Sequence, residues 1–399
     1  MKNTLTKYYL LGALVLGIIA CSDDDSDDNG GFTVIEKSAV IETYADLVLT
    51  NYQDSYDAAD AMKEAIDAFV AEPTSENFEA AKTAWKTARE PYGQTEAFRF
   101  ASGPIDDEDG PEGLLNAWPL DENYVDYVVD ADGVTVLETG IINNPEDFPT
   151  ITKEVLEGLN EVGSESNISV GYHAIEFLLW GQDTTDEEDK LPGQRPYTDF
   201  VDGDEGTATN QDRRRDYLAA CADLLLDHLQ LMLDEWSANG TYRPIFLGLD
   251  EDVALANMLT GISTLSKSEL AGERVFVAYD NQDQEDEHSC FSDNTHRDLR
   301  LNLAGIANVY RGSYSTVSGS SLEDLIVQEN PTLGAEITAK LVAAEAAVEA
   351  TATPFDFAIS DETERPLVFA AITALQTFGD ALVEGADELG LEISAELPE

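Results

Sequence analysis

Hydrophobic residues recur at steps of three and four along most of the chain, the spacing that places them on one face of an α-helix. The first long stripe ends before Pro73, where the helix is expected to stop. Its members are Ile41, Tyr44, Val48, Tyr52, Tyr56, Ala59, Met62, Ile66 and Phe69. Thr74 or Ser75 can cap a second helix, which ends before Pro91. That helix carries Phe78, Ala81, Trp85 and Ala88.

Three further stripes predict helices later in the chain. One helix runs from about residue 169 to residue 180. A second carries Tyr217, Cys221, Leu224, Leu225, His228, Leu231, Met232 and Trp236, and a third carries Leu367, Ala371, Leu375, Phe378, Leu382 and Leu389. Strand-like alternation is rare, so the sequence predicts an all-α fold of two helical-bundle halves packed side by side. Residues 201–210 are the candidate linker, which gives halves at 36–205 and 206–392.

The first 20 residues have the pattern of an export signal. Lys2 and Lys7 precede an apolar run that is too short to span a bilayer comfortably, and Ala20 stands directly before Cys21. This arrangement resembles the lipobox of bacterial lipoproteins, so Cys21 is the expected lipidation site and the anchor to the membrane. An ordinary cleaved signal is the alternative.

Residues 21–35 form an acidic, glycine-containing segment that is expected to be a flexible tether. It is similar to the export signal that directs Bacteroidetes lipoproteins to the cell surface, and a plain spacer is the alternative. The expected location is therefore the outer membrane or cell surface, facing outwards or towards the periplasm.

The chain is strongly acidic, with 22 basic and 80 acidic residues and a formal charge of -58. Such a surface repels nucleic acid and attracts cations, so nucleic-acid partners are excluded. Apolar residues make up 43% of the chain and aromatic residues 9%, which is the composition of a folded protein. Beyond Cys21, only Cys221 and Cys290 remain, and Cys221 is expected to be buried as a small apolar side chain.

The segment with the most chemistry is Gly171–Gly181, GYHAIEFLLWG. His173 and Glu176 are three residues apart, so both side chains leave one face of the predicted helix. An imidazole and a carboxylate together make half a metal site. The alternative is a buried, hydrogen-bonded pair without metal. His228 lies on an apolar helical face and is expected to be structural.

The GxHxxE pattern resembles the hallmark of the imelysin-like proteins, and other blocks match the same family in order from about residue 38 to residue 390. They are WKTAREPY at 85–92, TEAFRF at 95–100, GPID at 103–106, AWPLD at 117–121, GER at 272–274 and DQEDEHSCFSDNTH at 283–296. The resemblance implies a bacterial envelope protein tied to iron uptake. It also implies that the GxHxxE helix lies at the interface of two helical halves.

These blocks supply the candidate site residues. His173 and Glu176 are expected to bind a metal ion, with Glu96, Glu287 and His288 completing the site. Oxygen ligands with imidazole suit iron, and zinc is the second expectation. The groups expected to neutralise or orient these ligands are Arg89, Arg99, Asp106, Glu273, Arg274, Ser289 and Asp293. Buried ion pairs between helices are the alternative for Arg89, Glu96 and Glu273.

Three functions remain open from the sequence. The first is a lipoprotein that binds a metal ion or an iron-containing ligand in iron acquisition, with outer-membrane uptake components as partners. The second is a zinc peptidase, the older label of the family, although the chain has neither HExxH nor HxxEH. The third is a non-catalytic interaction module.

Overall fold

Helices account for most of the chain in this computed structural model, which describes residues 34–107, 110–130 and 136–397. The α-helices are α1 (Lys37–Ala71), α2 (Ser75–Thr95), α3 (Glu112–Leu115), α4 (Glu122–Val125), α5 (Gly140–Asn143), α6 (Lys153–Glu157), α7 (Gly171–Trp180), α8 (Gln211–Trp236), α9 (Tyr242–Leu247), α10 (Glu251–Thr264), α11 (Val277–Asn281), α12 (Thr295–Arg311), α13 (Leu322–Glu329), α14 (Pro331–Glu349), α15 (Phe355–Ser360) and α16 (Arg365–Glu388). The export signal, Cys21 and nearly all of the acidic tether lie outside the described residues.

Other elements are short. There are 3-10 turns at η1 (Glu96–Phe98), η2 (Tyr197–Phe200), η3 (Gly203–Glu205) and η5 (Gln284–Asp286), and a π-helix at η4 (Leu265–Phe276). Two antiparallel hairpins pair β1 (Val128–Val129) with β2 (Val136–Leu137) and β3 (Ser313–Tyr314) with β4 (Val317–Ser318). The prediction of an all-α fold is therefore confirmed.

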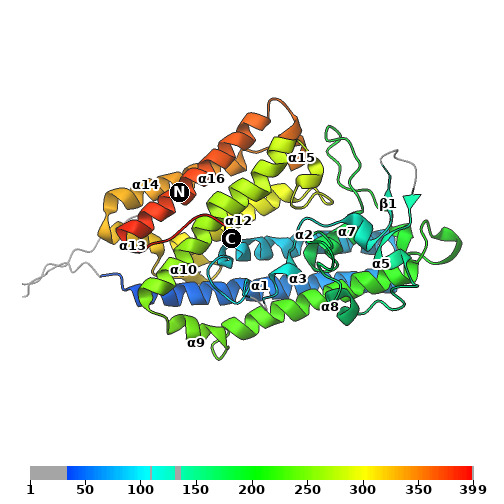
Figure 1. Ribbon diagram of the computed structural model, residues 1–399, viewed down its shortest axis with the longest axis horizontal. Helices are drawn as coiled ribbons and strands as arrows, with labels where there is room; N and C mark the ends of the chain where they lie inside the picture. The colour runs from blue at the N-terminus through cyan, green and yellow to red at the C-terminus, as the bar shows by residue number, and fades with distance from the viewer. Residues whose placement is uncertain (1–33, 108–109, 131–135, 398–399) are drawn as a thin grey trace, which may run out of the picture. The chain divides into compact units, whose positions relative to one another are not determined.

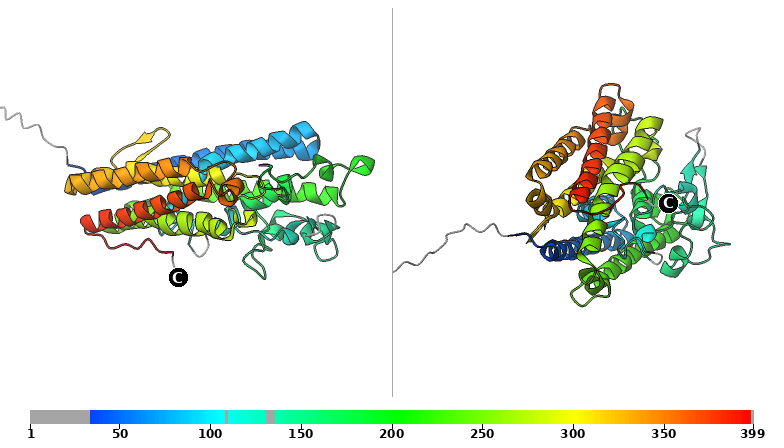
Figure 2. Two further views of the ribbon diagram at one scale, coloured as in Figure 1. Left: turned by 90° about the horizontal axis from the view of Figure 1, so that it is seen from above. Right: turned by 60° about the vertical axis from the view of Figure 1, so that its left-hand side comes forward.

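The long helices form two groups within residues 35–399. Helix α1 lies along both α2 and α8, and the second group consists of α10, η4, α12, α14 and α16. Figure 2 shows in its right-hand view that the orange and red C-terminal helices lie apart from the blue α1. Helix α12 connects the groups because it packs on α2 as well as on η4 and α14. The predicted boundary at residue 206 precedes α8, whose neighbours are α1 and α7.

The hydrophobic stripe of α1 is buried as its spacing predicts, and Thr74 caps α2 by accepting a hydrogen bond from the backbone of Asn77. The expected end before Pro91 is wrong, because α2 continues through Pro91 to Thr95. The proline lacks the N–H that would bond the carbonyl four residues earlier, which is a local cost. Asn51 of α1 donates its Nδ2–H to the Pro91 carbonyl at 2.9 Å, a contact that ties this turn of α2 to α1. Packing of α1 along α2 thus outweighs the local cost.

Helix α16 has the length and hydropathy of a membrane-spanning helix. It packs along η4, α14 and α10, which accounts for its apolar residues within a folded core. The two cysteines of the described chain, Cys221 and Cys290, are buried free thiols. Cys221 thus lies in the core, as its helical stripe predicts.

Asp126 is the anchor of the irregular region between α2 and α8. It is fully buried and accepts hydrogen bonds from Arg195 at 2.6 Å and from Arg214 at 2.7 and 2.8 Å. Burial alone would raise the pKa of Asp126, but the two guanidiniums outweigh it and lower that pKa to about 2. The carboxylate thereby ties α4 and the loop at residue 195 to α8.

Replacement of Asp126 by alanine is expected to lower the free energy of unfolding by about 3–5 kcal/mol, because two buried guanidiniums lose their counter-charge. Denaturant unfolding at pH 7 measures this change. The exposed Asp202, which pairs with Arg215, is the control, and Asp202→Ala is expected to cost less than about 1 kcal/mol. Since the pKa is lowered in the folded state, the stabilisation is present above about pH 4 and is lost as the pH falls towards 2. Equal losses in the two variants would contradict this role.

Candidate functional site

Helix α7 carries the GxHxxE motif, and all ten of its residues are buried. Gly171 begins the helix with a φ of 86°, in the left-handed region that favours glycine. A Cβ atom at this position would lie 2.7 Å from the carbonyl oxygen of Leu115. The glycine of the motif is therefore required both by backbone conformation and by the close approach of α3.

His173 and Glu176 face each other on α7, as their spacing predicts, with 2.9 Å between His173 Nδ1 and Glu176 Oε2. The other carboxylate oxygen of Glu176 accepts hydrogen bonds from the backbone N–H and the hydroxyl of Ser292, at 3.0 and 2.7 Å. Glu176 thus joins α7 to the 283–296 segment. Its carboxylate orients the imidazole and leaves His173 Nε2 as the free ring nitrogen.

His288 lies against His173, with their ring centroids 4.7 Å apart and their planes nearly perpendicular. Its Nδ1 is 3.2 Å from Asp298 Oδ2 on α12. Trp118 packs against both rings, at 5.0 Å from His173 and 6.5 Å from His288. Each imidazole is therefore held at Nδ1 by its own carboxylate, Glu176 for one and Asp298 for the other.

Arg89 of α2 holds Asp298, the carboxylate that binds His288. Its guanidinium donates to Asp298 Oδ1 at 3.0 and 3.3 Å and to Asn116 Oδ1 at 2.5 Å, and it is almost completely buried. Ser289 also donates its hydroxyl to Asp298, at 2.5 Å. Burial would raise the pKa of Asp298, but Arg89 and His288 hold it well below its usual range. Asp298 is thus a fixed negative charge.

Both imidazoles are neutral in this setting. Burial is the largest cause, and neighbouring guanidiniums add to it, so the pKa of His173 lies well below its usual value and that of His288 falls to about 3. Burial also raises the pKa of Glu176 to about 8, against the hydrogen bonds from Ser292. Among the described residues His173 Nε2 has no hydrogen-bond partner, and His288 Nε2 has a long contact of 3.5 Å to Asn116.

Glu96 is bound by arginines rather than presented to a ligand. Arg274 donates to it at 2.5 Å, Asn116 donates at 3.3 Å, and Arg99 lies at 3.5 Å. Burial opposes ionisation, but Arg274 and Arg99 outweigh it and lower the pKa of Glu96 to about 2. Arg99 also contacts Asp106, which accepts its Nε–H at 3.3 Å. Glu96 and Arg89 therefore form buried ion pairs in this structure, which is the alternative that the sequence left open for them.

Arg274 is positioned by the π-helix η4. It donates to Glu269 at 3.0 and 3.1 Å, and these two residues are five positions apart. In a π-helix residues five apart lie one turn apart, so the unusual pitch aligns the pair. Such π-helical segments are frequent at functional sites. Glu273, beside Arg274, is exposed and forms no part of this buried network.

A cleft of about 510 Å³ opens onto this network at His288, Asn116 and Trp118. The charged residues of its lining are two arginines and six acidic side chains: Arg99, Arg274, Glu112, Glu161, Glu165, Glu269, Glu273 and Asp286. His173 lies behind His288 and Trp118, out of contact with solvent. The cleft is therefore acidic, with a neutral imidazole in its wall.

The candidate ligands do not gather at one point. His173, Glu176 and His288 come together, whereas the pKa of Glu287 is raised well above its usual value by burial and then by Asp356, Asp293 and Asp183. In the described part of the chain, no group of three His, Cys, Asp or Glu side chains is arranged to hold a metal ion by itself. Sequence reasoning missed Asn116 and Asp298. Asn116 directly precedes the AWPLD block, while no spacing in the sequence singles out Asp298.

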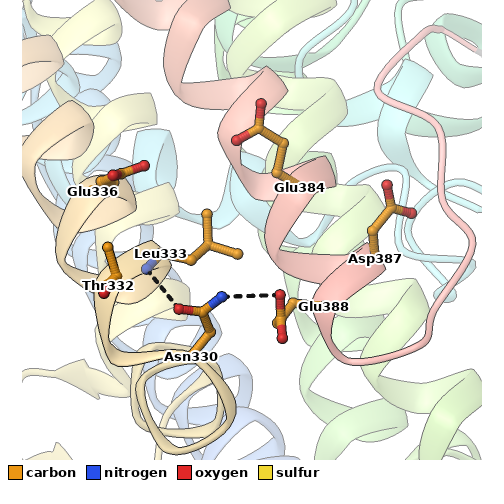
Figure 3. Close-up of a pocket in the computed structure, with 7 residues that line it drawn as sticks. All are labelled: Asn330, Thr332, Leu333, Glu336, Glu384, Asp387 and Glu388. Carbon is orange, nitrogen blue, oxygen red and sulfur yellow. Dashed lines mark hydrogen bonds between the residues drawn. The ribbon is translucent and has the colours of Figure 1, made fainter.

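A second hollow lies between α14 and α16, as Figure 3 shows. Its lining includes Glu336, Glu384, Asp387 and Glu388, and Asn330 donates to Glu388 at 3.1 Å while capping α14. These side chains sit on the rims of two packed helices. They include no imidazole or guanidinium, so the hollow lacks the chemistry of the cleft at His288.

Comparison with known proteins supports one family. The family model described as Imelysin (Peptidase M75) matches residues 48–382. Iron-regulated protein A of Synechococcus elongatus is 26% identical over 337 residues, which cover 84% of this chain and 82% of that protein. A crystal structure assigned as an iron-regulated protein A precursor, from Parabacteroides distasonis, aligns with a TM-score of 0.69 at 21% identity and covers 90% of this chain and 97% of that one. This last likeness concerns the fold.

The neutral imidazoles give a prediction for titration. The NMR signals of His173 and His288 are expected to stay constant between pH 5 and 8, because burial keeps both rings unprotonated. In urea the same rings should titrate near 6.5. Since the folded pKa values are lowered, this stabilisation is complete above about pH 6.5 and declines as the pH falls towards 3. Titration of either ring near 6.5 in the folded protein would show that burial does not control it.

Proposed function

This chain belongs to the imelysin family, and we propose that it binds an iron species as cargo in the acidic cleft that ends at His288. An iron-related role is suggested by the name of its relative, Iron-regulated protein A. The observation that carries the proposal is the neutral imidazole of His288, fixed at Nδ1 by Asp298 and placed in the wall of a cleft with six acidic side chains.

The donor set fits iron that arrives with ligands of its own. An imidazole whose Nδ1 is hydrogen-bonded to a carboxylate presents Nε2 as a ligand, and both His288 and His173 have this arrangement. Carboxylate oxygens and imidazole suit iron. Of the two, only His288 lines the cleft. One imidazole is too few to hold a bare ion, so the remaining positions are expected to be filled by acidic residues of the cleft and by the iron complex itself.

Electrostatics favour capture of a cation. The acidic lining outnumbers Arg99 and Arg274, and the chain as a whole has a formal charge of -58. A cleft of one charge raises the local concentration of the opposite charge. Arg274 and Arg99 keep Glu96 ionised behind the cleft, which adds to this field.

A zinc peptidase is less well supported by the same geometry. Catalytic zinc takes three protein ligands and a water. Here Glu176 is engaged with His173 and Ser292, and Asp298 with Arg89, His288 and Ser289. Both carboxylates orient imidazoles rather than completing a set of three ligands. Incubation with denatured casein, with and without a chelator, tests this alternative.

Iron binding should depend on His288. The mature chain, equilibrated with ferric citrate and separated by gel filtration, is expected to retain iron, measured by mass spectrometry of the metal. His288→Ala should lower the apparent affinity by about 10-fold or more, since a ligand and its carboxylate support are lost together. Glu176→Gln should have a smaller effect in the same direction, because it alters only the orientation of His173.

The control for this experiment is His228→Ala, which removes an imidazole from α8, outside the cleft. It is expected to bind iron as the original chain does, and circular dichroism confirms that each variant is folded. Equal iron retention by the original chain and His288→Ala would refute binding at the cleft.

We also propose that Cys21 anchors this protein to a membrane on the outside of the cytoplasm. The support is the apolar run before Ala20 and Cys21, followed by an acidic segment. The full chain, expressed in a bacterium, is expected to incorporate a labelled fatty acid and to enter the detergent phase on extraction, because acyl chains bind the bilayer. Cys21→Ser should do neither. Equal labelling of the two proteins would argue for an ordinary cleaved signal.

A further inference from the structure

The ring nitrogen His173 Nε2 is a buried polar atom that binding at His288 alone leaves unused. His173 is completely buried, and its Nδ1 lies 2.9 Å from Glu176. Among the described residues, Nε2 has no hydrogen-bond partner. Since buried polar groups are almost always paired, an unpaired nitrogen in the centre of the motif needs an explanation.

Two rings close His173 off from the cleft. Trp118 lines the cleft, and its ring centroid lies 5.0 Å from that of His173. His288 also lines the cleft, with its ring centroid 4.7 Å from that of His173. His173 itself forms no part of the lining. A molecule in the cleft therefore meets Trp118 and His288 before it can reach His173.

The two covering rings are held in different ways. His288 is fixed through its Nδ1, which lies 3.2 Å from Asp298. Trp118 is half-buried, and its indole N–H forms no hydrogen bond to any residue that the structure describes. The indole is held only by packing against the rings of His173, His288 and Phe291. Trp118 is thus the one of the two covering rings that can move without breaking a hydrogen bond.

The loop that carries Trp118 is anchored at its ends and free in its middle. It connects α3 to α4, and the backbone of residues 117–120 forms no hydrogen bond to the rest of the described chain. At one end Asn116 accepts a hydrogen bond from Arg89 at 2.5 Å. At the other end the backbone N–H of Asp121 donates to a carbonyl at 2.7 Å. Segments with few hydrogen bonds open at low free-energy cost, so Trp118 can be displaced while the network around Asn116 stays in place.

We propose that Trp118 is a movable cover over His173: its indole leaves the wall of the cleft when the cargo enters, and His173 Nε2 then binds the cargo beside His288. This inference rests on the proposed binding of an iron species in the cleft, and it adds the residue that controls access to the inner imidazole. It also accounts for the unpaired nitrogen, because Nε2 finds its partner only when the cover is displaced.

The cover has a physical consequence for exchange of the cargo. An indole that must move first slows both entry and release, since association is slower when it requires a conformational change. Loops that open and close over a site set the rate of binding and release in many proteins. Trp118 would therefore act on the kinetics of exchange, whereas His288 and His173 act on affinity.

Labelling of His173 by diethyl pyrocarbonate in the iron-free mature chain tests the cover without any metal. Peptide mass spectrometry at low extents of labelling locates the modified ring. His173 should be labelled about tenfold faster or more in Trp118→Ala than in the original chain, because the ring that covers it is gone. Trp118→Phe should give an intermediate rate, since a smaller ring covers less. His296 on α12, outside the cleft, should be labelled equally in all three.

The matched control is Tyr124→Ala, which removes a half-buried ring from α4, outside the cleft. It should label His173 at the rate of the original chain, and circular dichroism confirms that each variant is folded. Equal labelling of His173 in the original chain and Trp118→Ala would overturn the proposal. The same acceleration in Tyr124→Ala would also overturn it, because loss of packing would then explain the result.

Time courses of iron uptake and release with ferric citrate test the second half of the proposal. Trp118→Ala should both take up and release iron about threefold faster or more, because no indole has to move. A residue that only packs in the wall would speed release without speeding uptake, and that result overturns the cover. Bound iron should also protect His173 from labelling in Trp118→Ala, and unprotected His173 would exclude it as a ligand. If the original chain retains no iron, the cleft site itself fails; if it retains iron but Trp118→Ala loads no faster, only the cover fails.

Discussion

The buried ion pair between Arg89 and Asp298 is the interaction on which the centre of the molecule depends. It joins α2 to α12, and α12 is the helix that connects the two groups of helices. Asp298 in turn holds His288 and Ser289, and Arg89 holds Asn116 at the wall of the cleft. A buried charge that loses its partner is strongly destabilising, so this pair constrains both the fold and the position of the imidazole.

The same network determines the state of the ligands. Burial and the guanidiniums of Arg89 and Arg274 keep His173 and His288 neutral. A neutral imidazole has a lone pair to offer, whereas an imidazolium has none. Arg274 thus has two effects: together with Arg99 it keeps Glu96 ionised behind the cleft, and it adds to burial in opposing protonation of His288. Neutral imidazoles suit the binding of a cation, because neither ring has to lose a proton before a metal binds.

The sequence predicted the long helices and one part of the site, the His173–Glu176 pair. Periodicity located α1, α7, α8 and α16 because their stripes are long, and the three-residue spacing placed His173 and Glu176 on one face. It failed where tertiary packing outweighs local preference. Pro91 lies inside α2, where α1 packs along that helix and Asn51 contacts the Pro91 carbonyl. A hydrophobic pattern of period 3.6 does not predict the π-helix η4. In the structure its altered pitch brings together Glu269 and Arg274, which are five positions apart.

Contacts between residues far apart in the chain could not be predicted either, because local patterns do not show which distant residues meet. Asp298 meets Arg89 across more than two hundred residues, and nothing local to either one identifies the other. Consecutive residues also mislead, since Glu287 and His288 look like one chelating pair in the sequence, but only His288 is hydrogen-bonded to Asp298 in the buried network. The 283–296 segment is held by hydrogen bonds to two helices, since Ser289 donates to Asp298 of α12 and Ser292 donates to Glu176 of α7. The position of His288 therefore depends on contacts between distant parts of the chain, which local sequence patterns do not reveal.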